Sequence, residues 1–209
     1  MIEVPPDALT ALEAALDAPD VGLAGSVLVE YDDPAHVQAY AGAVSRRSFR
    51  GRHLGQGLAV AERAAIAARV GGAELRRDEI LYPVGASMLA TRAFVTDIGL
   101  MEEGYFLYYE EADWVLRGLP RYRAVIAPDS LVYHKHGASA GSTREGGSAR
   151  STGFLFRSRL RIARTLAPRS MPWVVLGLVN EGGRALLRGR TGKARAAWRA
   201  LTGQVRVPR

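Results

Sequence analysis

The chain has 209 residues, of which 48% are hydrophobic and 23% are charged. A chain of this length and composition can bury a core of its own, which excludes an intrinsically disordered protein. Because the sequence contains no cysteine, disulfide frameworks, thiolate metal sites and cysteine nucleophiles are excluded as well. A metal ion would need ligands from His, Asp or Glu.

The formal net charge of +7 is distributed unevenly. Residues 1–113 carry 9 Lys and Arg against 18 Asp and Glu, whereas residues 114–209 carry 19 against 3. The basic second part favours an anionic partner, such as phospholipid headgroups, nucleic acid or a phosphorylated substrate. The acidic N-terminus with its two prolines predicts no secretory signal, and the apolar stretch Met171–Val179 is too short to cross a bilayer. We expect a cytoplasmic protein, soluble or peripheral on the inner face of the membrane.

The first elements in chain order are a short amphipathic helix over residues 7–16 and a strand buried on both faces over residues 21–29. Residues 31–57 lose periodicity and predict a long surface excursion. The alanines of residues 58–70 favour a helix. A strand that bends or ends near Gly85 is expected over residues 80–89, followed by a short helix over residues 93–100.

The second half of the chain begins with a helix that is expected to start near Glu110. Residues 122–133 predict two short strands joined by a turn, and the Gly/Ser-rich residues 137–153 predict a loop. From Phe154 onward, arginines and apolar residues follow helical spacing. We therefore divide the chain into a main domain, residues 1–153, and a basic helical extension, residues 154–209.

The densest cluster of ionisable groups lies in YFLYYEEADWVLR, residues 105–117, where three carboxylates follow an aromatic run. On a helix starting near Glu110, Glu110 and Asp113 share a face, and Asp113 can pair with Arg117. One interpretation is an acidic first turn favoured by the helix dipole. The other is a general base whose pKa is raised because aromatic rings shield it from water.

Two imidazoles follow at the end of a predicted strand. Alternation places His134 and His136 on one face about 7 Å apart, either as solvated strand-end residues or as metal ligands. The next residues, Gly137–Gly141, match the GxSxG pattern of serine hydrolases. In such hydrolases a His follows the Ser, and no His follows residue 136, so this function is not expected.

Three segments together resemble the second half of the catalytic domain of family 2 glycosyltransferases, especially the rhamnosyltransferase-like branch. The first is similar to that family's Gly-Ala loop, helix and acidic motif, the second to its last core strand and histidine, and the third to its arginine-rich exit helix. The resemblance covers residues 20–165. The segments are PVGASMLATRAFVTDIGLMEEGYFLYYEEADWVLR (83–117), VIAPDSLVYHKHGASAG (125–141) and FRSRLRIARTLAP (156–168).

The resemblance implies a partial GT-A fold, a Rossmann-like α/β architecture, and an inverting transfer of sugar from a nucleotide-diphosphate donor to a hydroxyl of a cell-envelope or exported glycan. It also implies a divalent cation, Mg or Mn. The base falls on Glu111, and Glu110 and Asp113 stay alternatives because Glu stands where Asp is commoner in the family. His134 matches the histidine near the metal and phosphates. The substrate-binding candidates are Gly85, Ala86, Ser87 and Trp114.

One departure from the family concerns the donor site. The nucleotide-binding half, with its DxD-type motif, should precede the segment that resembles EVPPDALTAL, and the sequence begins there. The acids of Glu30-Tyr31-Asp32 come one strand too late to replace that motif, so we expect a turn. The chain is then expected to be either truncated or a remnant that needs a partner for donor binding. The alternative function is a non-catalytic membrane-surface or partner-binding module.

The basic tail carries 15 basic and 2 acidic residues over positions 144–209. It is interpreted either as a solvated helical extension or as a helix on an anionic membrane, where lipid-linked acceptors reside. Nucleic-acid binding is not expected because no recognised motif accompanies the charge. The arginines that would spread around the first helix are Arg157, Arg159, Arg161 and Arg164, and the membrane candidates are Trp173, Leu176, Leu178 and Val179.

These expectations combine into one hypothesis about the site. A carboxylate from residues 110–113 should face an imidazole of the His134 segment across a shared crevice.

Overall fold

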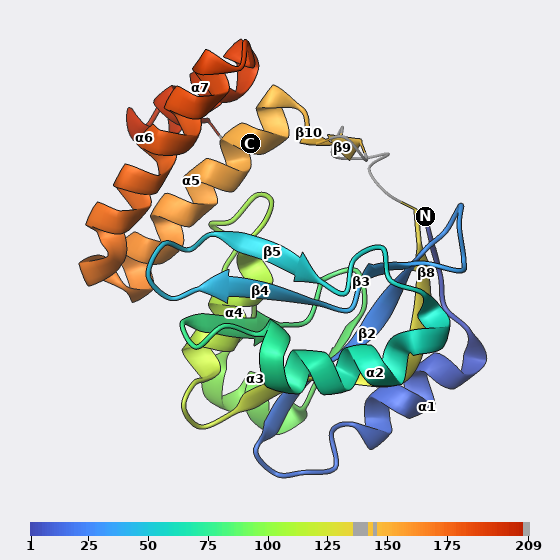
Figure 1. Ribbon diagram of the computed structural model, residues 1–209. Coiled ribbons are helices and arrows are strands. Elements are labelled where there is room, and N and C mark those ends of the chain that lie inside the picture. Colours follow the sequence, from blue (N-terminus) through green and yellow to red (C-terminus); the bar gives the residue numbers. More distant parts are fainter. Residues whose placement is uncertain (136–141, 144–145, 207–209) are drawn as a thin grey trace.

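The computed structural model describes residues 1–135, 142–143 and 146–206 and shows a mixed α/β structure, as the sequence predicts. Its main sheet has the strand order β1-β8-β2-β3, and β7 pairs with β2 beside β3. The strands β2 and β8 run parallel and form its centre (Figure 1). The strands are β1 (Ile2–Glu3), β2 (Val21–Glu30), β3 (Val37–Ala39), β7 (Met88–Ala90) and β8 (Arg123–His134).

The long surface excursion predicted for residues 31–57 is wrong. This segment contains β3 and two strands of a second sheet, and residues 37–44 are buried. The sequence of this segment does not alternate between apolar and polar residues, because small residues are buried on both faces of its strands. At Gly42, a Cβ atom would lie 2.2 Å from the Tyr82 ring, so this close contact requires glycine. The second sheet has the order β5 (Gly51–Leu54), β4 (Ala41–Ser45) and β6 (Glu79–Tyr82).

The buried strand predicted over residues 21–29 is confirmed as β2. The two short strands predicted over residues 122–133 are instead one strand, β8. Ala127 pairs with Ser26 and Leu131 pairs with Val27, so the three residues between Ala127 and Leu131 have no counterparts on β2. The turn-forming Pro128 and Asp129 are accommodated in this bulge without ending the strand.

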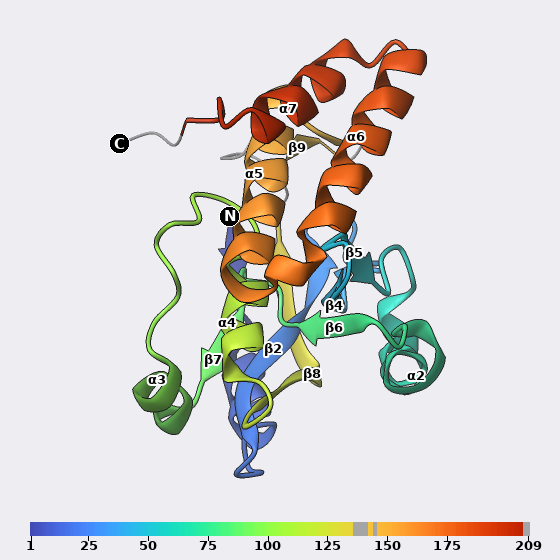
Figure 2. The same ribbon diagram turned by 90° about the vertical axis from the view of Figure 1, so that its left-hand side faces the viewer.

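The helices predicted near residues 7–16, 93–100 and 110 are confirmed, and the one over residues 58–70 is confirmed in part. Leu12 of the first helix packs on Ala24, whereas Ile66 packs with Val27, so these helices lie over opposite faces of β2. Figure 2 shows the helices α2 and α3 on either side of β2 and β8. The helices are α1 (Pro6–Ala14), α2 (Arg63–Arg69), α3 (Arg92–Ile98) and α4 (Glu110–Gly118), with irregular turns over 60–62 and 70–74.

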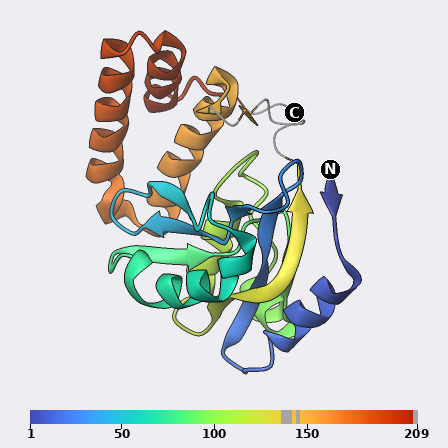
Figure 3. The ribbon, with the colours of Figure 1, turned by 45° about the vertical axis from the view of Figure 1, so that its right-hand side comes forward.

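Three further helices form a layer at one end of the molecule (Figures 1 and 3). Phe156 and Leu160 of this layer share a core with Phe94 and Val115. The proposed domain boundary between residues 153 and 154 falls inside the first of these helices. They are α5 (Ala149–Leu166), α6 (Met171–Leu187) and α7 (Thr191–Leu201).

The loop predicted over residues 137–153 lies partly outside the described residues, as do His136 and the GxSxG pattern of residues 137–141. Within the described part, β9 (Ser142–Thr143) pairs with β10 (Gly146–Gly147), and α5 follows directly. No helix in the described ranges combines the length and apolarity that crossing a membrane requires.

Helix α5 docks on the segment that leads into α4. Arg157 donates to the Gly104 carbonyl over 3.2 Å, and the Ser158 hydroxyl donates to the Leu107 carbonyl over 3.0 Å. Arg161 pairs with Glu102 over 2.8 Å. The interpretation of this helix as a solvated extension is therefore wrong, since its polar side chains hold the aromatic run before α4.

Candidate functional site

The start of α4 is held in an uncommon backbone conformation. Tyr108 and Tyr109 have φ angles of 69° and 76°, in the left-handed region that few non-glycine residues adopt. The buried Tyr109 donates its hydroxyl hydrogen to the Phe49 carbonyl. Backbone strain of this kind persists where surrounding contacts impose it. Here the conformation of Tyr108 and Tyr109 sets the direction in which α4 begins, and with it the direction of the Glu110 and Glu111 side chains.

Glu111 lies against the loop that follows β6. Its Oε1 accepts a hydrogen bond from the backbone N–H of Gly85 over 2.9 Å. A Cβ atom at position 85 would lie 2.3 Å from the same oxygen, so the contact requires glycine. The resemblance implies that Gly85 binds substrate, and in the structure the group that lies against it is the candidate base itself.

The pKa values of Glu110 and Glu111 are both raised above the ordinary glutamate value. Burial, reinforced by the negative charge of Glu110, raises the pKa of Glu111 to about 7. Burial also raises the pKa of Glu110, and its Oε2 is buried with no hydrogen-bond partner in the part of the chain that the structure describes. The pair can therefore hold and release a proton near neutral pH.

Tyr82 completes the apolar surroundings of these carboxylates. Burial raises the pKa of its hydroxyl, and the charges of Glu111, Tyr109 and Glu110 add to the effect. Its ring covers Gly42. The aromatic setting expected around the acids is thus supplied from β6 as well as from the run before α4.

Asp113 makes a different set of contacts from Glu111. It is buried and accepts hydrogen bonds from the Tyr105 hydroxyl over 3.0 Å and from Arg117 Nε over 2.8 Å. The predicted pair with Arg117 is confirmed. Its position two residues after Glu111 places it on another face of α4, where both of its oxygens hold the fold together.

Trp114 likewise has structural contacts. Its indole N–H donates to the Gly99 carbonyl over 2.8 Å, and its ring packs edge-on against Phe94 with centroids 5.2 Å apart. These contacts join α4 to α3. The structure does not bring Trp114 to the contact between Glu111 and Gly85.

The other loop candidates fix the loop in place. The Ser87 hydroxyl lies 2.6 Å from that of Ser26, which in turn lies 2.8 Å from that of Ser130. Ser130 donates to the Ala8 carbonyl over 2.8 Å. Val84 and Ala86, on either side of Gly85, pack against the buried cluster of Ala8, Leu28, Ala39 and Val132. The sheet therefore anchors the loop on both sides of Gly85.

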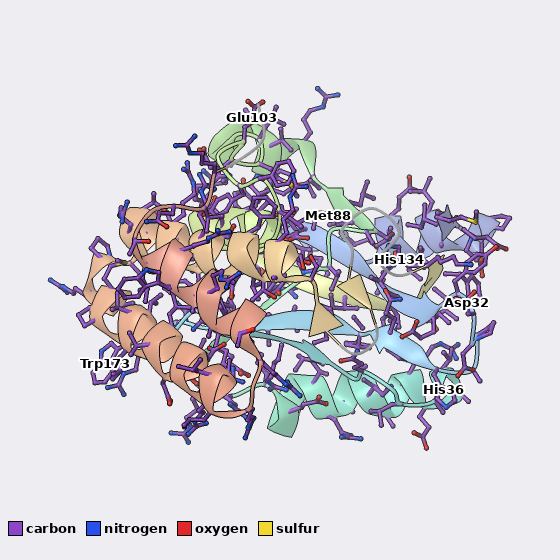
Figure 4. The ribbon with its side chains drawn as sticks, turned by 90° about the horizontal axis from the view of Figure 1, so that it is seen from above. Asp32, His36, Met88, Glu103, His134 and Trp173 are labelled. Carbon is purple, nitrogen blue, oxygen red and sulfur yellow. The ribbon has the colours of Figure 1, made fainter. Side chains whose placement is uncertain are left out.

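His134 ends β8 and is oriented by a buried glutamine. Its Nδ1 lies 2.7 Å from Gln38 Oε1, while Gln38 Nε2 donates to the His134 carbonyl over 2.9 Å and to Glu30 Oε2 over 3.3 Å. Because Gln38 Oε1 is an acceptor, we assign the proton to Nδ1 and the lone pair to Nε2. An imidazole held in this way has the tautomer of a metal ligand. Figure 4 shows His134 and Asp32 on the same side of the molecule.

The described residues around His134 do not supply a full set of metal ligands. No group of three or more His, Cys, Asp or Glu suited to a metal ion occurs in residues 1–135, 142–143 and 146–206. Tyr31 and Asp32 lie in a turn, as expected, and Asp32 pairs with Lys135 over 3.3 Å. Within those ranges, which leave out His136, the divalent cation implied by the resemblance finds no set of three ligands, and no step below is assigned to it.

The loop after β6 connects the two candidate groups. Gly85 contacts Glu111, while its neighbours Val84 and Ala86 pack against the buried cluster that includes Val132, two residues before His134. Residues two apart on a strand lie on the same face. The shared crevice between the carboxylate and the imidazole stays a prediction.

Three polar residues of this region were not predicted. Gln38 lies in the segment that we took for a surface excursion, although it is one polar residue inside an apolar run. Tyr82 precedes the Pro-Val-Gly turn and was counted only as part of a strand. Ser26 interrupts a buried strand, and a polar residue at such a position is a signal for a buried hydrogen-bond partner.

Neither the models of known protein families nor the curated proteins gave a match to this chain. Its function must therefore be inferred from the chemistry of the site.

Proposed function

We propose that the site around Glu111 transfers a sugar from a nucleotide-diphosphate donor to an acceptor hydroxyl with inversion, the reaction of the family 2 glycosyltransferases that the sequence resembles. The acceptor would be a cell-envelope or exported glycan, or its lipid-linked form. One observation carries the proposal. Glu111, whose pKa burial raises to about 7, accepts a hydrogen bond from the backbone of the loop that resembles this family's Gly-Ala loop.

Glu111 acts as the general base in this reaction. Its Oε1 is engaged by Gly85, so Oε2 accepts the proton of the acceptor hydroxyl. The hydroxyl oxygen forms a bond to the anomeric carbon while the bond from that carbon to the diphosphate oxygen breaks, and the electron pair leaves with the nucleoside diphosphate. A base of pKa near 7 is partly ionised at neutral pH and still binds the proton well, which is the favourable range for proton transfer.

Glu110 and Gly85 tune the base in opposite directions. The charge of Glu110 raises the pKa of Glu111, whereas the Gly85 N–H stabilises the ionised form and lowers it. Glu110 is a positioning and tuning residue in this scheme. The N–H also fixes the carboxylate in one orientation, which proximity catalysis requires.

The competing function is a non-catalytic module without donor binding. It is favoured by the turn at Tyr31 and Asp32 and by the lack of a three-ligand group among the residues that the structure covers. In that case the buried glutamates would be inherited features, and the protein would bind a membrane or a partner.

Thermal unfolding with donors separates the two functions. We expect UDP-glucose, GDP-mannose or dTDP-rhamnose, each with Mn²⁺, to raise the unfolding temperature, because a ligand at one hundred times its Kd stabilises the native state by about 2.7 kcal/mol. The corresponding free monosaccharides with Mn²⁺ serve as controls. If none of the three nucleotide sugars shifts the transition, the non-catalytic function is the correct one.

A further inference from the structure

A cavity lies in the helical layer, and neither Glu110 nor Glu111 is among its lining residues. Its volume is about 270 Å³, and it opens where α5, α6 and α7 meet the turn between β4 and β5. Among the described residues that line it, Glu181 is the one acid. The cations that line it are Arg50, Arg159, Arg184, Arg188, Arg190 and Lys193.

Arg159 contributes a buried charge to this cavity. It is 2% exposed, its Nη1 donates to Glu181 over 2.7 Å and its Nη2 donates to the Ser48 carbonyl over 3.1 Å. Its Nε is buried and has no partner within the described ranges. Glu181 also lies 3.9 Å from Lys193, so a single carboxylate opposes six cations. The cavity is therefore suited to an anion that several guanidinium groups can contact at once.

An exposed apolar stripe runs along α6 beside the cavity. Trp173, Leu176 and Leu187 are 45%, 59% and 89% exposed. Eleven residues make about three helical turns, so Arg184 of the cavity lies on nearly the same side of α6 as Trp173. Leu178, which we expected to face a membrane, is instead buried in the core. Val179 and Leu186 are 55% and 61% exposed and widen this apolar surface, because they lie about 120° to 140° around α6 from Trp173.

We propose that this face of the helical layer docks on an anionic phospholipid bilayer, with the α6 stripe in the interfacial region and a lipid phosphate in the cationic cavity. A phospholipid has both the charge and the apolar chains that match these adjoining surfaces. A free phosphate or a nucleic acid would match the charge and leave the stripe uncovered. Figure 4 shows Trp173 at the opposite side of the molecule from His134, so docking leaves the His134 end of the sheet exposed.

Co-sedimentation of the full chain with vesicles tests the proposal. We expect binding to vesicles of phosphatidylcholine with phosphatidylglycerol, weakened by salt, and little binding to phosphatidylcholine alone. The double variant Arg184→Glu/Arg188→Glu should bind roughly tenfold or more weakly, because each basic residue near an anionic surface contributes to binding. The variant Leu176→Ser/Leu187→Ser should also bind more weakly, since it removes apolar insertion without a change of charge.

The matched control is Arg77→Glu/Arg92→Glu, which changes the net charge equally at exposed positions on other elements and should bind like the wild type. The exposure of all these residues allows each variant to fold, which unfolding temperatures verify. The proposal is overturned by equal binding to both kinds of vesicle, or by wild-type binding of the Arg184/Arg188 variant. Binding of pyrophosphate or an oligonucleotide at these arginines without any vesicle binding would also overturn it. Donor binding is measured without lipid, so a failure of the membrane-docking proposal can be distinguished from a failure of the proposed sugar transfer.

Discussion

Replacement of Glu111 by Gln is expected to lower sugar-transfer turnover by about 10²- to 10⁴-fold, the usual contribution of a general base. The glutamine side chain fills the same space, and its Oε1 can still accept the Gly85 hydrogen bond. Its amide cannot accept the proton of the acceptor hydroxyl. Donor affinity should stay near the wild-type value, because Glu111 accepts a proton from the acceptor hydroxyl and is not needed to bind the donor. Release of nucleoside diphosphate measures turnover.

The stability of the Glu111→Gln variant shows whether a loss of turnover could come from unfolding. The folded pKa of about 7 lies above the unfolded value of about 4.3, so the wild type loses stability as the pH rises through this range. At pH 8 the variant lacks the buried charge and should be as stable as the wild type or more stable, by up to about 3 kcal/mol. The matched control is Glu103→Gln, the same chemical change at an exposed residue of another segment (Figure 4). Wild-type turnover in Glu111→Gln would remove this residue from the role of base.

Replacement of Gly85 by Ala should reduce transfer by about 10²-fold, since a shift of about 1 Å at a catalytic group has an effect of this size. The new Cβ would lie 2.3 Å from Glu111 Oε1 and near its carboxyl carbon at 3.0 Å. The carboxylate must move away and lose the N–H contact. Turnover should therefore fall while donor affinity changes less, and the pKa of Glu111 should rise because the N–H no longer stabilises the ionised form.

The control for this substitution is Gly71→Ala. A Cβ atom at Gly71 meets nothing within 4 Å, so this variant should keep wild-type turnover. If Gly85→Ala also keeps wild-type turnover, the contact between the loop and Glu111 has no part in the reaction.

The parts of the fold that could be predicted have a clear local pattern. α4 begins at Glu110, as expected from acids that follow an aromatic run, and β2 is a compact apolar strand. Residues 37–44 were misjudged because Gly42 and its alanine neighbours pack against large side chains such as Tyr82. Such packing depends on side chains of the partner strand, so the sequence of residues 37–44 shows no periodic pattern that would predict it.

The residues of the candidate site could be predicted from the sequence, but the contacts between them could not. Glu111 and Gly85 were each singled out, yet their hydrogen bond joins segments 26 positions apart. Asp113 and Trp114 stand beside Glu111 in the sequence and are used for packing instead, because helix spacing does not tell which face of α4 meets the core. The partner of His134 could not be predicted, since Gln38 reaches it from β3.

The most direct measurement of the central claim is a carbon-13 NMR titration of the glutamate side-chain carboxyls, in which the signal missing from Glu111→Gln identifies Glu111. The account predicts a midpoint near 7 for this carboxyl. A midpoint near the ordinary glutamate value of about 4.3 would contradict it, because Glu111 would then be an ionised, solvated residue of an acidic helix start.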